Sequence, residues 1–160
     1  MLRRLLRTDN DPAALIMRLV LGLVFFPHGA QKVLGWWGGY GASATIQGFA
    51  KNLGLPPWLT VLVMAAELGG SLLLIVGFLT RFAAFSIGAV MAAALLMVHA
   101  KVGFFMNWSG AQKGEGFEYH ILALGLAIAL MIKGGGALSI DHALSRDEYE
   151  SSTAPSLPRM

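Results

Sequence analysis

Apolar residues form four runs along the chain, each about as long as a helix that crosses a lipid bilayer. The runs cover residues 13–34, 58–79, 82–100 and 117–132. About 20 apolar residues, at 1.5 Å of helical rise per residue, match a hydrocarbon core of roughly 30 Å. The pattern therefore predicts an all-α protein: a four-helix transmembrane bundle over residues 13–144, with a short segment before it (1–12) and a flexible tail after it (145–160).

The basic residues predict how this bundle lies in the membrane. Cytoplasmic segments of membrane proteins carry an excess of Lys and Arg. With a cytoplasmic N-terminus, the outer loops would hold only Lys51, Lys101 and Lys113, and the remaining loop and terminal cations would be cytoplasmic: Arg3, Arg4, Arg7, Arg81, Lys133, Arg146 and Arg159. We therefore expect both termini in the cytoplasm. The arginines before the first run also resemble the start of a secretory signal. Arg18 interrupts that run, so we expect the first helix to be retained.

The connections between the runs differ strongly in length. Only Thr80 and Arg81 separate the second run from the third, which predicts two antiparallel neighbouring helices. The segment 35–57 contains aromatic residues typical of the membrane interface, and its apolar spacing favours a short surface helix over residues 43–52. The segment 101–116 is also rich in aromatic residues, and we interpret it as a lid.

Composition narrows the functional classes. Hydrophobic residues make up 56% of the 160 residues and charged residues 13%, about half the charged share of soluble domains. The chain has no cysteine, which excludes disulfides and thiol chemistry, so a redox role requires a bound cofactor. The net charge of +3 comes from cations at helix ends and in loops rather than from a basic stripe, so nucleic acid is not an expected partner.

Ionisable residues inside the first predicted helix lie on one face. A charged side chain at the bilayer centre costs about 2.5 to 3.5 kcal/mol on insertion scales, so such groups usually face the bundle interior and have partners. At 100° per residue, Arg18, His28 and Lys32 fall within about 80° of one another. We expect this face to point into the bundle.

The other three helices each contribute ionisable groups. Glu67 lies within the second run, His99 near the end of the third, and Glu118 at the start of the fourth. Counting about 1.5 Å per residue from the helix starts places all of these groups except Arg18 in the outer half of the bundle. The predicted site therefore has a catalytic pair and a surrounding polar cluster: His28 and Glu67, with Arg18, Lys32, His99 and Glu118.

Structural interpretations of the same residues remain open. Lys32 can extend to the interface, and Arg18 can form a purely structural salt bridge with Glu67. His99 and His120, both near helix ends, are more often bonded to backbone than to metal. No metal is expected, because the chain has no His pair at i, i+3 or i+4 and no Glu-x-x-His pair.

Several segments together resemble the DoxX family of small bacterial membrane proteins. In the first half these are Arg18 to Gly22, Phe25 to Gly29, Lys32, Glu67 to Gly70 and Gly77 to Arg81. In the second half they are His99, Gly103 to Phe105, Glu118 with Tyr119, and Gly135 to Asp141. The resemblance implies a four-helix protein of the bacterial inner membrane. It also implies relatives that include a subunit of a thiosulfate:quinone oxidoreductase and membrane partners of redox enzymes.

Three functions follow as hypotheses. The first is a redox-associated subunit that binds a quinone or a similar lipophilic molecule, with His28 and Glu67 as hydrogen-bonding and proton-transfer groups. The second is a proton-coupled transporter, which with four helices per chain would require a homodimer. The third is a non-catalytic scaffold in the lipid bilayer that recruits a redox-enzyme partner, with the polar cluster binding helix to helix.

Overall fold

The computed structural model describes residues 5–145, and in this part of the chain the regular elements are all helices. They include, in chain order, α2 (Pro12–Leu34), η1 (Trp36–Gly38), α3 (Gly41–Leu53), α4 (Pro57–Met64), η2 (Ala65–Gly69), α5 (Gly70–Val76), α6 (Thr80–Ala94), η3 (Leu95–His99) and α7 (Glu118–Lys133). The all-α prediction is confirmed, and α3 occupies the place of the predicted surface helix. The predicted tail lies outside the described residues except for Ser145.

Within residues 5–145, three continuous helices are long and apolar enough to cross a membrane. They are α2, the helix Pro57–Val76 formed by α4, η2 and α5, and the helix Thr80–His99 formed by α6 and η3. The fourth helix, α7, has 16 residues, which corresponds to about 24 Å, so its crossing stays a prediction. Large apolar side chains are exposed on all four helices, as expected for surfaces that face lipid: Ile16, Leu23, Leu62, Leu72, Phe82, Phe85, Leu122 and Ile132.

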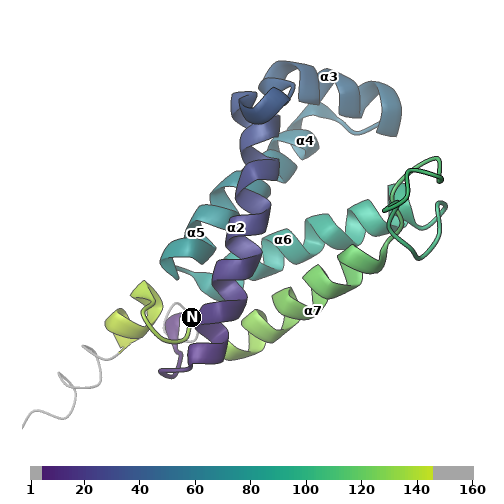
Figure 1. The fold of residues 1–160 in the computed structure, drawn as a ribbon. Helices are drawn as coiled ribbons and strands as arrows, with labels where there is room; N and C mark the ends of the chain where they lie inside the picture. The colour runs from purple at the N-terminus through teal and green to yellow at the C-terminus, as the bar shows by residue number, and fades with distance from the viewer. Residues whose placement is uncertain (1–4, 146–160) are drawn as a thin grey trace, which may run out of the picture.

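The helices form two halves that diverge (Figure 1). The first half consists of α2, α3 and the helix Pro57–Val76, and the second is the α6–α7 hairpin. The halves pack together near residues 5–11, 77–80 and 134–145, which we call the terminal end. They separate toward residues 35–56 and 100–117, the loop end. Buried apolar side chains between them form the core: Leu21, Phe25, Leu74, Ala83, Ala84, Ile87, Met91, Ala123, Ala127 and Leu130.

Arg18 is buried at the terminal end and pairs with backbone, with 1% of its surface exposed. Its guanidinium donates to the carbonyl oxygens of Leu74 and Ile75 at the end of α5, at 3.1 and 2.6 Å. It also donates to three carbonyl oxygens of the segment after α7, those of Gly135, Ala137 and Leu138. The interpretation that Arg18 forms a salt bridge with Glu67 is therefore wrong, because the hydrogen-bond donors of the guanidinium are taken up by backbone carbonyl oxygens.

Asp141 closes the turn between α5 and α6. Its fully buried carboxylate accepts from the backbone N–H groups of Leu79 and Thr80, at 2.8 and 2.9 Å. The turn is thus Gly77 to Leu79, and α6 begins at Thr80. The prediction that Thr80 and Arg81 form the connection was wrong by a few residues, because the capping group comes from a distant part of the sequence.

Replacing Asp141 by alanine is expected to lower the free energy of unfolding by about 2 kcal/mol, because two buried N–H groups lose their acceptor. The measurement is the temperature at which half of the protein leaves the monodisperse peak on size-exclusion chromatography in mild detergent. Asp9→Ala, at an exposed carboxylate of the same end, is the matched control. Equal midpoints for the two variants would contradict the capping role.

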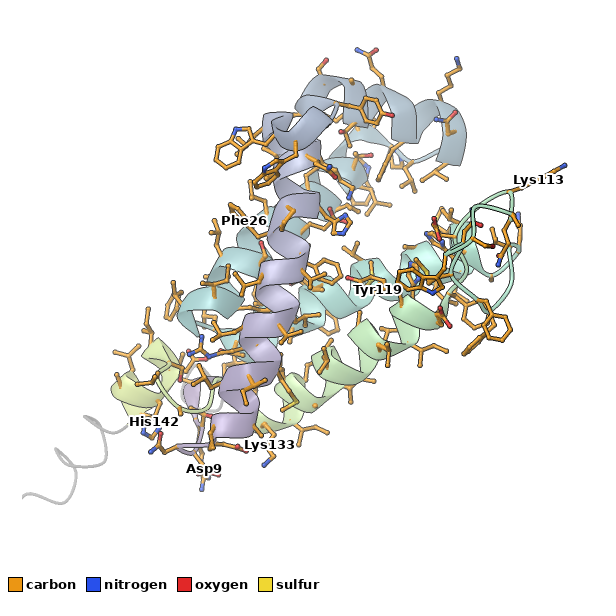
Figure 2. The ribbon with its side chains drawn as sticks, in the orientation of Figure 1. Asp9, Phe26, Lys113, Tyr119, Lys133 and His142 are labelled. Atoms are coloured by element: carbon orange, nitrogen blue, oxygen red, sulfur yellow. The ribbon has the colours of Figure 1, made fainter. Side chains whose placement is uncertain are left out.

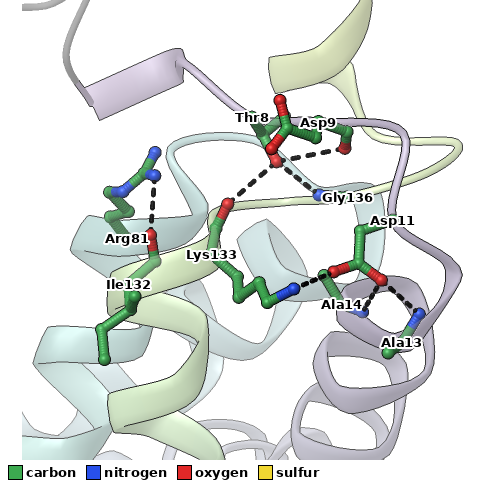
Figure 3. A network of polar contacts seen from close by, with 9 residues as sticks. All are labelled: Thr8, Asp9, Asp11, Ala13, Ala14, Arg81, Ile132, Lys133 and Gly136. Carbon is green, nitrogen blue, oxygen red and sulfur yellow. Dashed lines mark hydrogen bonds and ion pairs between the residues drawn. The ribbon is translucent and has the colours of Figure 1, made fainter.

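A polar clasp, made of Thr8, Asp11, Arg81 and Lys133, joins the first described residues to the end of α7 (Figure 3). Lys133 Nζ lies 2.6 Å from Asp11 Oδ2, and Thr8 Oγ1 donates to the Lys133 carbonyl oxygen at 3.1 Å. Arg81 donates to the carbonyl oxygens of Met131 and Ile132. Hydrogen bonds from Lys133 and from backbone lower the pKa of Asp11, so the ion pair is formed above the ordinary pKa of an aspartate and is lost as the pH falls through the lowered value.

Candidate functional site

A cavity of about 520 Å³ lies where the two halves diverge. Its walls come from α2, α3 and the helix Pro57–Val76 on one side, and from α6, η3 and the start of α7 on the other. Met106 and Glu115 of the segment predicted as a lid also line it. The volume lies in the range of pockets for small molecules, about 300–1,000 Å³. The lining is mainly apolar, with polar groups at a few places.

An ion pair between a partly exposed lysine and a buried glutamate lies on the wall of the first half. Lys32 Nζ lies 2.6 Å from Glu67 Oε2, with 25% and 5% of the two side chains exposed. Thr45 Oγ1 of α3 donates to the Lys32 carbonyl oxygen at 3.1 Å, which holds the short helix against α2. The interpretation that Lys32 extends alone to the interface is therefore wrong. Its ammonium instead neutralises a carboxylate that would otherwise be costly to bury.

Two wide helical turns position residues of this site. Glu67 lies in the π-helical turn η2, and His99 closes the second such turn, η3. In a π turn each N–H bonds the carbonyl five residues back, as the 2.7 Å bond from Ala100 N–H to the Leu95 carbonyl oxygen does. Such turns are rare and often occur at functional sites. A π turn changes the face of the helix on which the following residues lie. Counting at about 100° per residue therefore does not predict the positions of those residues.

A histidine pair and a tyrosine form the opposite wall. The rings of His99 and His120 lie 4.1 Å apart between centroids, and His99 Nδ1 lies 2.8 Å from the Glu115 carbonyl oxygen. Tyr119 stacks on Phe25 with centroids 6.5 Å apart, and Figure 2 shows its side chain reaching from α7 toward α2. The Tyr119 hydroxyl and His120 Nδ1 are buried without a hydrogen-bond partner among residues 5–145. Buried polar atoms are usually paired, so these two groups are available to a ligand.

The structure brings together four of the six residues that the sequence predicted. His28, Lys32, Glu67 and His99 all line the cavity. Arg18 lies at the terminal end, as described above. Glu118 turns away from the cavity, and its Oε1 accepts from Met106 N–H and Trp108 Nε1 of the loop, at 3.0 and 3.2 Å.

Sequence reasoning missed Tyr119 and His120 as lining residues. The available signal was the two-residue spacing of Glu118 and His120, which sends their side chains to opposite faces of α7. His120 has 5% of its surface exposed and is the member that faces inward. Among residues 5–145, no three His, Cys, Asp or Glu side chains lie close enough together to hold a metal ion.

The chain is similar to known proteins of one membrane-protein family. The DoxX family model matches residues 13–100. The chain is 29% identical to "Inner membrane protein YqjF" of Escherichia coli, over 86% of this chain and 95% of that protein. It is 30% identical to "Putative oxidoreductase CatD" of Bacillus subtilis, over 79% and 83% of the two chains.

A third relative, an uncharacterized protein of Haemophilus influenzae, is 31% identical over 82% of this chain and 83% of its own. No solved structure matches the chain. The family match and the three long apolar helices indicate a multi-pass protein of the bacterial inner membrane. On these grounds the chain belongs to the DoxX family.

Proposed function

We propose that this DoxX protein is a redox-associated subunit with four membrane-spanning helices, which binds a quinone in the cavity between its two halves. The observation that carries the proposal is the placement of polar groups in that cavity. Lys32 and Glu67 lie on one wall, and the unpartnered Tyr119 hydroxyl and His120 Nδ1 lie on the other. Between them the lining is apolar. A flat ring with a carbonyl oxygen at each of two opposite edges fits this distribution of donors.

The residues have complementary roles in this proposal. The Lys32 ammonium donates a hydrogen bond to one carbonyl oxygen, and Glu67 holds that ammonium in place and carries a proton. Tyr119 and His120 serve the second oxygen, and His28 lines the cavity beside Lys32. A bound quinone supplies the two-electron chemistry that the chain's own side chains lack. The apolar walls keep water from the site, which strengthens each of these polar contacts.

The orientation and the electron source complete the proposal. The distribution of Lys and Arg favours a cytoplasmic terminal end, which places the cavity in the outer half of the membrane. Electrons would come from a partner redox enzyme. One relative carries the word oxidoreductase in its name, which supports a redox role. The name does not identify the partner enzyme.

Replacing Glu67 by glutamine is expected to reduce the quinone that co-purifies with the protein at least tenfold. A neutral amide no longer fixes the Lys32 ammonium, and a hydrogen bond to a charged group is worth about 1.5 to 3 kcal/mol, a factor of roughly 10 to 150. The measurement is extraction and mass spectrometry of lipophilic molecules from protein purified in mild detergent.

Glu118→Gln is the matched control, because an amide oxygen still accepts the two hydrogen bonds of Glu118 and the residue lies outside the cavity lining. Quinone retained by wild type and by Glu118→Gln, and lost from Glu67→Gln, would support the proposal. If all three proteins retain only bulk phospholipid, the quinone proposal is refuted and the scaffold hypothesis takes its place.

A further inference from the structure

A second, apolar hollow of about 470 Å³ lies between the helix Pro57–Val76 and the helix Thr80–His99. It adjoins the cavity, because five residues line both: Leu55, Val63, Val90, Ala93 and Met97. We call this hollow the tail groove. A molecule whose head group lies in the cavity therefore has an apolar groove directly beside it.

The groove is long and almost free of polar groups. Along α6 and η3 its lining extends from Phe82 to Met97, 15 residues or about 22 Å along the helix axis. No charged side chain lines it, and the hydroxyl of its one serine, Ser86, donates to the Phe82 carbonyl oxygen at 2.9 Å. Small residues such as Ala66 and Gly69 leave space between the two helices that larger side chains would fill. The groove therefore matches a hydrocarbon chain that runs along the helices.

We propose that the tail groove holds the single long apolar tail of the ligand whose head group occupies the cavity, namely the isoprenoid tail of a membrane quinone. The inference rests on the proposed function and adds the class of ligand: a tailed quinone rather than a small water-soluble one. The position of the groove beside a cavity that contains the ion pair and the unpartnered Tyr119 hydroxyl favours a molecule with one polar end. A helix of a partner protein in the groove would leave the polar groups of the cavity without a hydrogen-bond partner.

Gly69 offers a direct test. A Cβ added at Gly69 meets no atom within 4 Å, so the backbone there accepts a side chain, and Gly69→Leu adds a leucine to the lining of the groove. Gly125 on α7 has equally open space, is exposed, and lies outside the linings of both hollows. Gly125→Leu is therefore the matched control for the effect of adding a leucine to a lipid-facing helix.

The experiment compares two probes that share one benzoquinone ring, one without a tail and one with a long isoprenoid tail. Binding is measured by calorimetry on protein in phosphatidylcholine nanodiscs, with protein-free discs subtracted. Gly69→Leu is expected to weaken binding of the tailed probe about tenfold, because a filled groove no longer admits the tail. Binding of the tail-free probe, and all binding to Gly125→Leu, is expected to stay within about twofold of wild type.

The outcomes separate this inference from the proposed function. If Gly69→Leu binds both probes as wild type does, the tail groove is refuted while quinone binding in the cavity stands. If wild type binds neither probe, the proposed function fails and the inference fails with it. If Gly69→Leu retains the tailed probe but loses a phospholipid that co-purifies with wild type, the groove is an acyl-chain site, and the isoprenoid assignment is overturned.

Discussion

Replacing Arg18 by methionine is expected to lower the free energy of unfolding by about 3–5 kcal/mol. The substitution leaves carbonyl oxygens of Leu74, Ile75 and the segment after α7 without their donor, and an unsatisfied buried polar group costs about 1–3 kcal/mol. At about 2–4 °C per kcal/mol for a chain of this length, the thermal midpoint in detergent should fall by roughly 10 °C. Size-exclusion chromatography after heating measures it.

Ile16→Met is the control for Arg18→Met, because Ile16 lies on the same helix and is exposed on its surface. Arg18→Lys provides a second comparison. A lysine keeps the charge but lacks the planar fork that reaches several carbonyl oxygens at once, so it should restore only part of the loss. Full stability of Arg18→Lys would mean that charge alone, and not the forked geometry, holds the terminal end together.

Replacing Gly29 by valine is expected to destabilise the protein by about 3 kcal/mol and to abolish ligand binding. A Cβ at Gly29 would lie 2.5 Å from the Leu68 backbone nitrogen and 2.6 Å from its Cα, and overpacking against backbone cannot be relieved by a side-chain rotation. The two helices must therefore separate beside the Lys32–Glu67 pair. The thermal midpoint and the co-purified quinone report the two effects.

Gly125→Val serves as the control for Gly29→Val, because the same side chain there enters open space. It should behave as wild type in both measurements. If Gly29→Val kept the thermal midpoint and the ligand of Gly125→Val, the close approach of α2 to η2 would not be required for the site.

The helices could be predicted because the information is local. Apolar runs gave the first predicted helix as 13–34, and the structure has Pro12–Leu34. The start of α6 could not be predicted in this way, since the cap of Thr80 comes from Asp141, 61 residues away. The partners of Arg18 were missed for the same reason: a pattern of side chains does not indicate which backbone carbonyls tertiary packing leaves free.

The site was predicted in part, because depth in a membrane can be counted along a helix. Counting placed His28, Lys32, Glu67, His99 and Glu118 in the outer half of the bundle, and all of these except Glu118 line the cavity. It did not give the pairing of Lys32 with Glu67, which depends on the wide turn η2 and on the close packing of α2 against it. Tyr119 lines the cavity because the two halves diverge beside it, and no local sequence pattern predicts that divergence.

The contacts of Arg18 also constrain how the protein is made. Its partner Gly135 follows it by 117 residues, so at about 5–20 residues per second translation needs roughly 6 to 23 s to supply that carbonyl. For part of this interval Leu74 and Ile75 are already present, but the three carbonyl groups after α7 are not, so water or other proteins must complete the solvation of the guanidinium. Synthesis is therefore a stage at which Arg18 lacks part of the hydrogen bonding that stabilises the finished protein.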